Sequence, residues 1–271
     1  MPSQDFTVAS LREYMEVVEQ LMATDEPVWY RGSGRVSYDL APSLYRHPDG
    51  TMTAEDYGEL EAKLLRRFRE RSIPYQAPSA NSDTEREWER LFVMQHFGVP
   101  TRLLDWTENP YIGLFFALSS ANFDFDTQEA LEDACVWALR PQGWNRAALS
   151  DISYEGDILS VGSPQLESFL PSADAAMRRV IPVAMYGLHN SPRIVAQRGV
   201  FTIFGSKPEP MDVVAKDNGY AEEILQRITV PAAEVKSLLK ALTSIGVTDS
   251  VIYPDLGGLA LEIKRHYGYR V

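Results

Sequence analysis

Short apolar segments that favour β-strands are spaced very unevenly along this chain of 271 residues. They are rich in β-branched and aromatic residues and lie at 28–30, 135–139, 200–204, 223–230 and 251–254. Because the intervals between them differ so widely, strands and helices do not alternate as they would in a doubly wound parallel sheet. The sequence therefore predicts an α+β fold, with a mixed, mainly antiparallel sheet flanked by helices.

Helices are predicted where apolar residues recur at spacings of three and four. These segments are 7–23, 54–72, 84–97, 111–119, 232–246 and 255–265. Gly98 is expected to end the third helix in the left-handed conformation. Asn109 and Pro110 form an N-cap and a first-turn proline for the fourth. The charged face of the second helix, which includes Glu61, is expected to be solvated.

Residues 73–83 and 141–180 show little periodicity and are predicted to be loops, the second with short helical pieces. We find no internal repeat, low-complexity tract or linker that would divide the chain. One domain is therefore expected over residues 1–271, with its core at about 28–262 and the helix 7–23 packed on it.

Composition and charge favour a cytoplasmic protein without membrane contact. No stretch approaches the roughly 20 apolar residues of a membrane span, and the first residues lack the pattern of a secretory signal. The single cysteine, Cys135, lies in an apolar run and is expected to be a buried small hydrophobe in a reducing compartment. The formal charge of −12 argues against bulk binding of nucleic acid, which requires a basic surface.

Several kinds of catalytic site have no pattern in the sequence. The histidines show no metal-ligand spacing, so no metal is expected; they are His47, His96, His189 and His266. A Gly-x-Ser-x-Gly nucleophile elbow, a P-loop and a Gly-x-Gly-x-x-Gly fingerprint are likewise missing.

Arg31 is the first candidate for ligand binding. It is expected at the end of the strand 28–30, on a turn whose glycines, Gly32 and Gly34, let the backbone approach a ligand closely. An arginine in that place suits bidentate capture of a phosphate or carboxylate. Pairing with a structural carboxylate is an equally good interpretation.

The stretch 95–109 is the densest group of polar side chains. Thr107 and Asn109 directly precede a helix N-terminus, where free N–H groups and the helix dipole favour anions. Asp105, Thr107 and Asn109 could simply cap the helix, but a cap needs only one such residue, so their surplus favours a functional role. His96 taken alone is weaker evidence for a functional site, since a lone histidine near a helix end is more often structural. A third candidate is Gln197, which precedes the strand 200–204 and could project into a cleft or lie on the surface.

These segments together resemble the FRG domain family, named for an aromatic-Arg-Gly motif. Tyr30-Arg31-Gly32 fills that motif, and the second block resembles 95–110 followed by the apolar helix through Phe115-Phe116-Ala117. Gln197-Arg198-Gly199-Val200-Phe201 is similar to the third block, and Tyr253-Pro254-Asp255-Leu256-Gly257-Gly258-Leu259 to a closing one. The likeness spans about residues 28–262.

A looser likeness is to the ADP-ribosyltransferase superfamily, which implies an ADP-ribosyltransferase-like fold and NAD as substrate. In that family a strand-borne aromatic-Arg-Gly holds NAD. The likeness implies polarising or catalytic roles for Arg31, His96, Asp105 and Gln197. It implies contacts to the nucleotide for Tyr30, Gly32, Thr101, Arg102, Trp106, Thr107 and Asn109.

The chain departs from the transferase pattern at one position that matters for catalysis. The pattern has a glutamate two residues after the Gln or Glu of its third element, and this chain has Gly199 there. The oxocarbenium-like centre that forms as nicotinamide leaves calls for a nearby carboxylate. Asp105 or Glu108 would have to replace that glutamate, or the protein binds without turnover.

Three hypotheses follow. The leading one is a nucleotide-binding domain that transfers ADP-ribose from NAD to an unknown acceptor. The second is a non-enzymatic module that senses a nucleotide or interacts with a partner, for example in bacterial stress or phage defence. The third is a hydrolase in which Asp105 and His96 form an acid–base pair.

Overall fold

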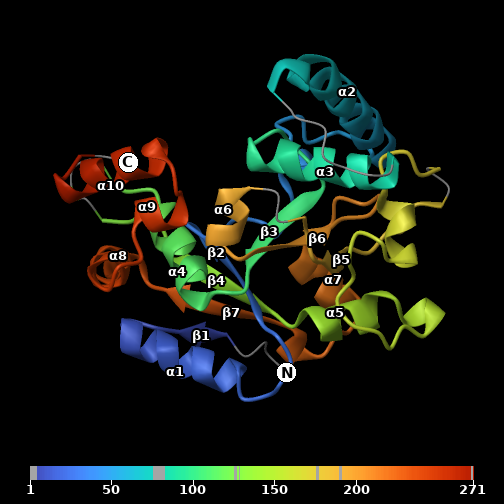
Figure 1. Cartoon of the computed structure of the whole chain (residues 1–271). Helices are drawn as coiled ribbons and strands as arrows, with labels where there is room; N and C mark the ends of the chain where they lie inside the picture. Colours follow the sequence, from blue (N-terminus) through green and yellow to red (C-terminus); the bar gives the residue numbers. More distant parts are fainter. Residues whose placement is uncertain are drawn as a thin grey trace.

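The computed structural model describes residues 5–75, 83–124, 127, 129–174, 177–188, 191–269 and 271. In this part of the chain seven strands form one mixed sheet in the order β1-β7-β4-β2-β3-β6-β5, with helices packed around it (Figure 1). β1 and β7 are parallel, and the other neighbouring strands are antiparallel. The prediction of an α+β fold with a mixed, mainly antiparallel sheet is confirmed.

The strands are short, with lengths of two to six residues. They are β1 Phe6–Thr7, β2 Trp29–Ser33, β3 Leu103–Thr107, β4 Ala134–Leu139, β5 Val183–Met185, β6 Gly199–Ile203 and β7 Leu225–Val230. The helices are α1 Leu11–Leu21, α2 Ala54–Ser72, α3 Asp83–His96, α4 Pro110–Ser119, α5 Pro141–Ala148, α6 Pro192–Ala196, α7 Met211–Asp217, α8 Val235–Ser244, α9 Asp249–Ile252 and α10 Leu256–His266.

The predicted helices are found, with differences at their ends. The first is shorter than the expected 7–23, because the Ser10 side chain accepts a hydrogen bond from Glu13 N and starts α1 at Leu11. Phe6–Thr7 instead forms β1 beside β7. Asn109 caps α4 as expected, and Gly98 follows α3 with a φ of 75°. Of the predicted loop 73–83, residues 76–82 lie outside the described part of the chain.

Besides β1, three strand assignments from the sequence need correction. The segment 251–254 is not a strand: Asp249–Ile252 forms the helical turn α9, in which Ile252 N donates to Thr248 O. The strands β3 and β5 were not predicted. In β3 the polar residues Asp105 and Thr107 interrupt the apolar pattern that indicates a strand.

Arg31 and Gly32 lie within a strand and not on a turn. β2 continues to Ser33 because it pairs with β4 from Trp29 to Ser33. Gly32 also allows α4 to pack directly on the strand, since a Cβ atom there would lie 2.2 Å from Gly113 O and from Ala117 N. This glycine therefore serves close contact between a helix and a strand, and not a turn.

The sheet is joined at its centre by a narrow seam between β2 and β3. These strands share one register pair, Tyr30 with Thr107. By contrast, β2 pairs with β4, and β3 pairs with β6, along their full lengths. The half β1-β7-β4-β2 thus meets the half β3-β6-β5 at one point, so that side chains of both halves border the same space.

A buried ion pair fastens the second half of the sheet to α2. Arg102, directly before β3, donates from Nε to Glu61 Oε1 at 2.7 Å. Its Nη1 and Nη2 donate to the backbone oxygens of Phe204 and Phe169, each at 2.6 Å. Arg178 Nη1 lies 3.4 Å from Glu61 Oε2. The expectation that Glu61 is solvated is therefore wrong: its side chain is 3% exposed, because it neutralises a buried arginine.

Replacing Glu61 by alanine should destabilise the fold strongly. The change leaves the Arg102 guanidinium buried without its counter-charge, and breaking a buried pair in this way costs about 3–5 kcal/mol. Glu59→Ala is the matched control, because Glu59 forms an exposed i,i+4 pair with Lys63, of the kind that contributes only about 0.3–0.5 kcal/mol. Urea unfolding of both variants measures the difference, and equal losses of stability would contradict this view of Glu61.

Candidate functional site

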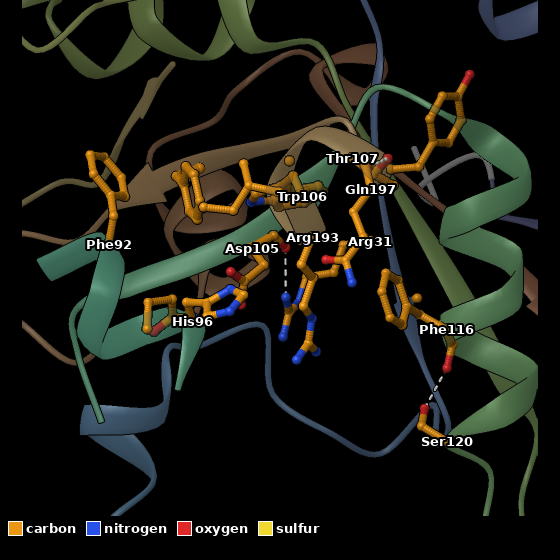
Figure 2. Close-up of a pocket in the computed structure, with 16 residues that line it drawn as sticks. Arg31, Phe92, His96, Asp105, Trp106, Thr107, Phe116, Ser120, Arg193 and Gln197 are labelled. Carbon is orange, nitrogen blue, oxygen red and sulfur yellow. Dashed lines mark hydrogen bonds between the residues drawn. The ribbon is translucent and has the colours of Figure 1, made fainter. Parts of the chain in front are cut away.

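A cavity of about 300 Å³ lies at the seam of the sheet. Its walls come from β2, β3 and β6 and from α3, α4 and α6 with the residues that directly follow the last two helices. Figure 2 shows the labelled side chains converging on it from three sides, with Phe92 and His96 at one end and Phe116 and Ser120 at the other. Segments far apart in the sequence thus form one concave site.

Most of the residues predicted for the site do line this cavity. They are Tyr30, Arg31, Gly32, His96, Asp105, Trp106, Thr107 and Gln197. Thr101, Arg102 and Asn109 do not. Arg102 is held in the buried pair with Glu61. Asn109 accepts a hydrogen bond from Tyr111 N and caps α4. The roles expected for the lining residues remain predictions.

Two arginines meet at the cavity, and the sequence pointed to only one of them. Arg31 Nη1 donates to the backbone oxygen of Asp105 at 2.6 Å, across the seam (Figure 2). Arg193, on α6, places its guanidinium 4.4 Å from the centre of the Tyr253 ring. Within the described residues neither arginine has a carboxylate oxygen within 4.0 Å, the limit for an ion pair.

Arg31 remains a cation despite its surroundings. Burial lowers its pKa to about 10, and the charge of Asp105 opposes that shift. At pH 7 the guanidinium is therefore protonated. Arg193 stands on a single short helix beside a proline, in a segment with no motif, which explains why sequence reasoning missed it.

Asp105 is the carboxylate at the cavity. Gln95 Nε2 donates to its Oδ2 at 2.5 Å. The residue is exposed at the cavity, but nearby protein partly desolvates the carboxyl group, which raises its pKa above the ordinary 3.8 against the opposing effect of Arg31. Glu108, the alternative carboxylate, does not line the cavity.

His96 lies at the edge of the site. Burial, and next the charge of Arg193, lower its pKa below 6.5. Its Nδ1 lies 3.4 Å from Ser191 Oγ. Among the hydrogen bonds of the described residues none joins His96 to Asp105, so the acid–base pair of the hydrolase hypothesis is not assembled directly.

The third predicted segment borders the cavity through a constrained backbone. Gln197 Nε2 donates to Ile252 O at 3.1 Å, and Arg198 has a φ of 46° that directs the chain into β6. At Gly199 a Cβ atom would lie 3.2 Å from the Ile194 side chain. A side chain at this position would therefore require Ile194 to shift by a few tenths of an ångström.

Thr107 also has a structural role, and the neighbouring Tyr30 keeps its hydroxyl proton. Thr107 Oγ1 donates to Gln197 O at 2.6 Å and accepts from Asn109 N at 3.0 Å. It therefore joins the end of β3 to the turn before β6 and to the start of α4. Burial raises the pKa of Tyr30 to about 12, so its hydroxyl stays protonated.

Aromatic rings complete the walls. Phe92 and Phe201 lie with ring centres 4.9 Å apart, and Phe116 on α4 lines the cavity at the end opposite Phe92 (Figure 2). Trp106 is anchored by its Nε1, which donates to Thr202 Oγ1 at 3.1 Å. The cavity thus combines two cations, one carboxylate and flat apolar surfaces.

The described part of the chain offers no group of histidine, cysteine and carboxylate side chains with the composition of a metal site. In the same part, each helix is too short or too polar to cross a membrane. His189 lies outside the described residues.

Residues 26–125 match the family model of the FRG domain. This match covers the aromatic-Arg-Gly motif and the 95–110 block, and the resemblance drawn from them is confirmed over this part of the chain. The third and closing blocks lie beyond the matched residues. Comparisons with curated proteins and with solved structures give no match.

Replacing Asp105 by asparagine should stabilise the protein at neutral pH. The raised pKa means that the ionised carboxylate costs the folded state free energy, so wild-type stability falls as the pH rises from about 3.8 through the folded-state pKa. Asparagine does not titrate and still offers Gln95 an acceptor oxygen.

Urea unfolding between pH 4 and pH 8 tests this expectation. The variant should be the more stable protein at pH 7, and its advantage should shrink as the pH approaches 4. A variant that is less stable than the wild type at pH 7, or a difference that does not depend on pH, would contradict the account of Asp105.

Proposed function

We propose that this cavity binds a nucleotide, with NAD as the foremost ligand. The observation that carries the proposal is the pair Arg31 and Arg193, which border one cavity without a carboxylate partner in the described part of the chain. Guanidinium groups bind phosphate through paired, charge-assisted hydrogen bonds. A local cationic pocket in a chain of charge −12 suits a small anion that enters a cleft.

The remaining walls suit the other parts of a nucleotide. Phe116 is partly exposed and offers a flat surface on which a heterocyclic ring can stack, whereas Trp106, Phe92 and Phe201 are buried and form the apolar floor of the cavity. The volume of about 300 Å³ lies at the lower end of the usual range for small-molecule sites, which is about 300–1,000 Å³. A dinucleotide would therefore place one nucleotide half inside the cavity and the other outside its mouth.

The likeness to ADP-ribosyltransferases supports a further step, the transfer of ADP-ribose to an acceptor. In this reaction the bond between ribose C1′ and the nicotinamide nitrogen breaks, and its electron pair returns to the nicotinamide ring. An acceptor nucleophile then forms the new bond to C1′ and releases a proton. Asp105 is the cavity carboxylate that could stabilise the positive charge at C1′.

The second function, a nucleotide sensor without turnover, is favoured by Gly199. This position carries no carboxylate, and a side chain there would contact Ile194 closely. The amide of Gln197 is also engaged with Ile252 O. A sensor of this kind would bind the nucleotide stoichiometrically and leave it intact.

Arg31→Ala and Arg193→Ala should each weaken NAD binding by about ten-fold to a hundred-fold, because each change removes hydrogen bonds between a charged donor and phosphate. Isothermal titration calorimetry with NAD measures the effect. Arg12→Ala is the control, since Arg12 is exposed on α1 and pairs only with Glu16 in the bonds described. Unchanged NAD affinity in both cavity variants, with wild-type binding intact, would refute the proposal.

Incubation with NAD separates the two functions. Free nicotinamide, followed by chromatography and lost in Arg31→Ala, would identify an NAD-cleaving enzyme. Binding without nicotinamide release would identify the sensor.

A further inference from the structure

A relay of hydrogen bonds leads from the buried backbone to the cavity carboxylate. Leu103 N donates to Thr101 Oγ1 at 3.1 Å. Thr101 Oγ1 donates to Gln95 Oε1 at 2.6 Å. Gln95 Nε2 then donates to Asp105 Oδ2 at 2.5 Å. Gln95 on α3 is thus hydrogen-bonded both to Thr101, which precedes β3, and to Asp105, which lies within β3.

The relay fixes the direction of each bond in it. An ionised carboxylate only accepts hydrogen bonds, so the direction of the bonds is set from Asp105, and the Thr101 hydroxyl donates to the Gln95 Oε1 that faces it. The Gln95 amide must then present its NH₂ group to Asp105, since the flipped amide would set its oxygen against the carboxylate. Thr101 is 1% exposed, so water does not compete for its hydroxyl.

The carboxylate of Asp105 is consequently held by one oxygen. Among the described residues no side chain other than Gln95 donates to it, and Asp105 borders the cavity together with Arg31 and Arg193. A carboxylate repels phosphate but accepts hydrogen bonds from hydroxyl groups. Phosphate donors and a hydroxyl acceptor therefore stand side by side in one cavity.

We infer that Asp105, positioned by Gln95 and Thr101, accepts hydrogen bonds from the 2′,3′-diol of a ribose and so selects ribonucleotides over 2′-deoxyribonucleotides. The inference rests on the proposed function, because it describes how the same cavity recognises the sugar between phosphate and ring. An acidic side chain that binds ribose hydroxyls is a known solution in dinucleotide-binding folds. Here the relay supplies a carboxylate whose orientation is set before the ligand arrives, which lowers the cost of ordering it on binding.

The test compares NAD with the two NAD analogues that each lack one ribose 2′-hydroxyl. The wild-type protein should bind one of these analogues at least about ten-fold more weakly than NAD, since the analogue leaves a charged acceptor without its donor. Asp105→Asn should reduce that ratio to about two-fold or less. The ratio of dissociation constants is measured by calorimetry for each protein.

Two variants of Thr101 distinguish positioning from mere stability. Thr101→Val removes the hydroxyl at nearly constant volume and frees the Gln95 amide to rotate, so the ratio should fall. Thr101→Ser keeps the hydroxyl and should preserve the ratio. A loss of stability alone would not change a ratio between two ligands of the same folded protein.

The outcomes separate this inference from the function on which it rests. If the wild-type protein binds NAD and both analogues equally, or if Asp105→Asn keeps the full preference, the inference is overturned while nucleotide binding stands. If the wild-type protein does not bind NAD at all, the proposed function itself fails, and the inference fails with it.

Discussion

The single backbone pairing between Tyr30 and Thr107 is the constraint on which the site depends. It joins two halves of the sheet at one point, whereas every neighbouring pairing of β2 and β3 is longer. Arg31 follows directly after this point and reaches the backbone of Asp105, which is 74 residues away in the sequence. A longer pairing would close the seam with main-chain hydrogen bonds. The short one leaves space for side chains from both halves.

The segment before β3 divides structural and functional tasks between neighbouring residues. Arg102 is drawn into the core by Glu61 and two backbone oxygens, which fixes where β3 begins. Thr101, one residue earlier, directs its hydroxyl to Gln95. Asp105, further along β3, lines the cavity and is oriented by its hydrogen bond from Gln95. The position of the cavity carboxylate thus depends on a buried ion pair that never touches the cavity.

Sequence reasoning predicted the features that local chemistry determines. The Asn109 cap, the Gly98 stop and the strand at β4 need only nearby residues. The aromatic-Arg-Gly motif and the 95–110 block also pointed to the part of the chain that the FRG domain match covers. These signals are contained within a few residues and do not require knowledge of distant partners.

The features that were missed depend on tertiary contacts. Arg102 and Arg31 look alike in the sequence, and only Glu61 on α2 decides that Arg102 is structural. Arg193 reaches the cavity because α6 packs beside α9, where Tyr253 lies against its guanidinium. The strand β3 exists because β6 pairs with it, although its polar residues disguise the pattern. A local sequence pattern does not show which distant residues will be in contact.

A crystal structure of the chain with NAD tests the central claim most directly. The account predicts phosphate oxygens within hydrogen-bonding distance, about 3.2 Å or less, of the guanidinium groups of both Arg31 and Arg193. NAD bound at another surface, with the cavity at the seam left open, would contradict it.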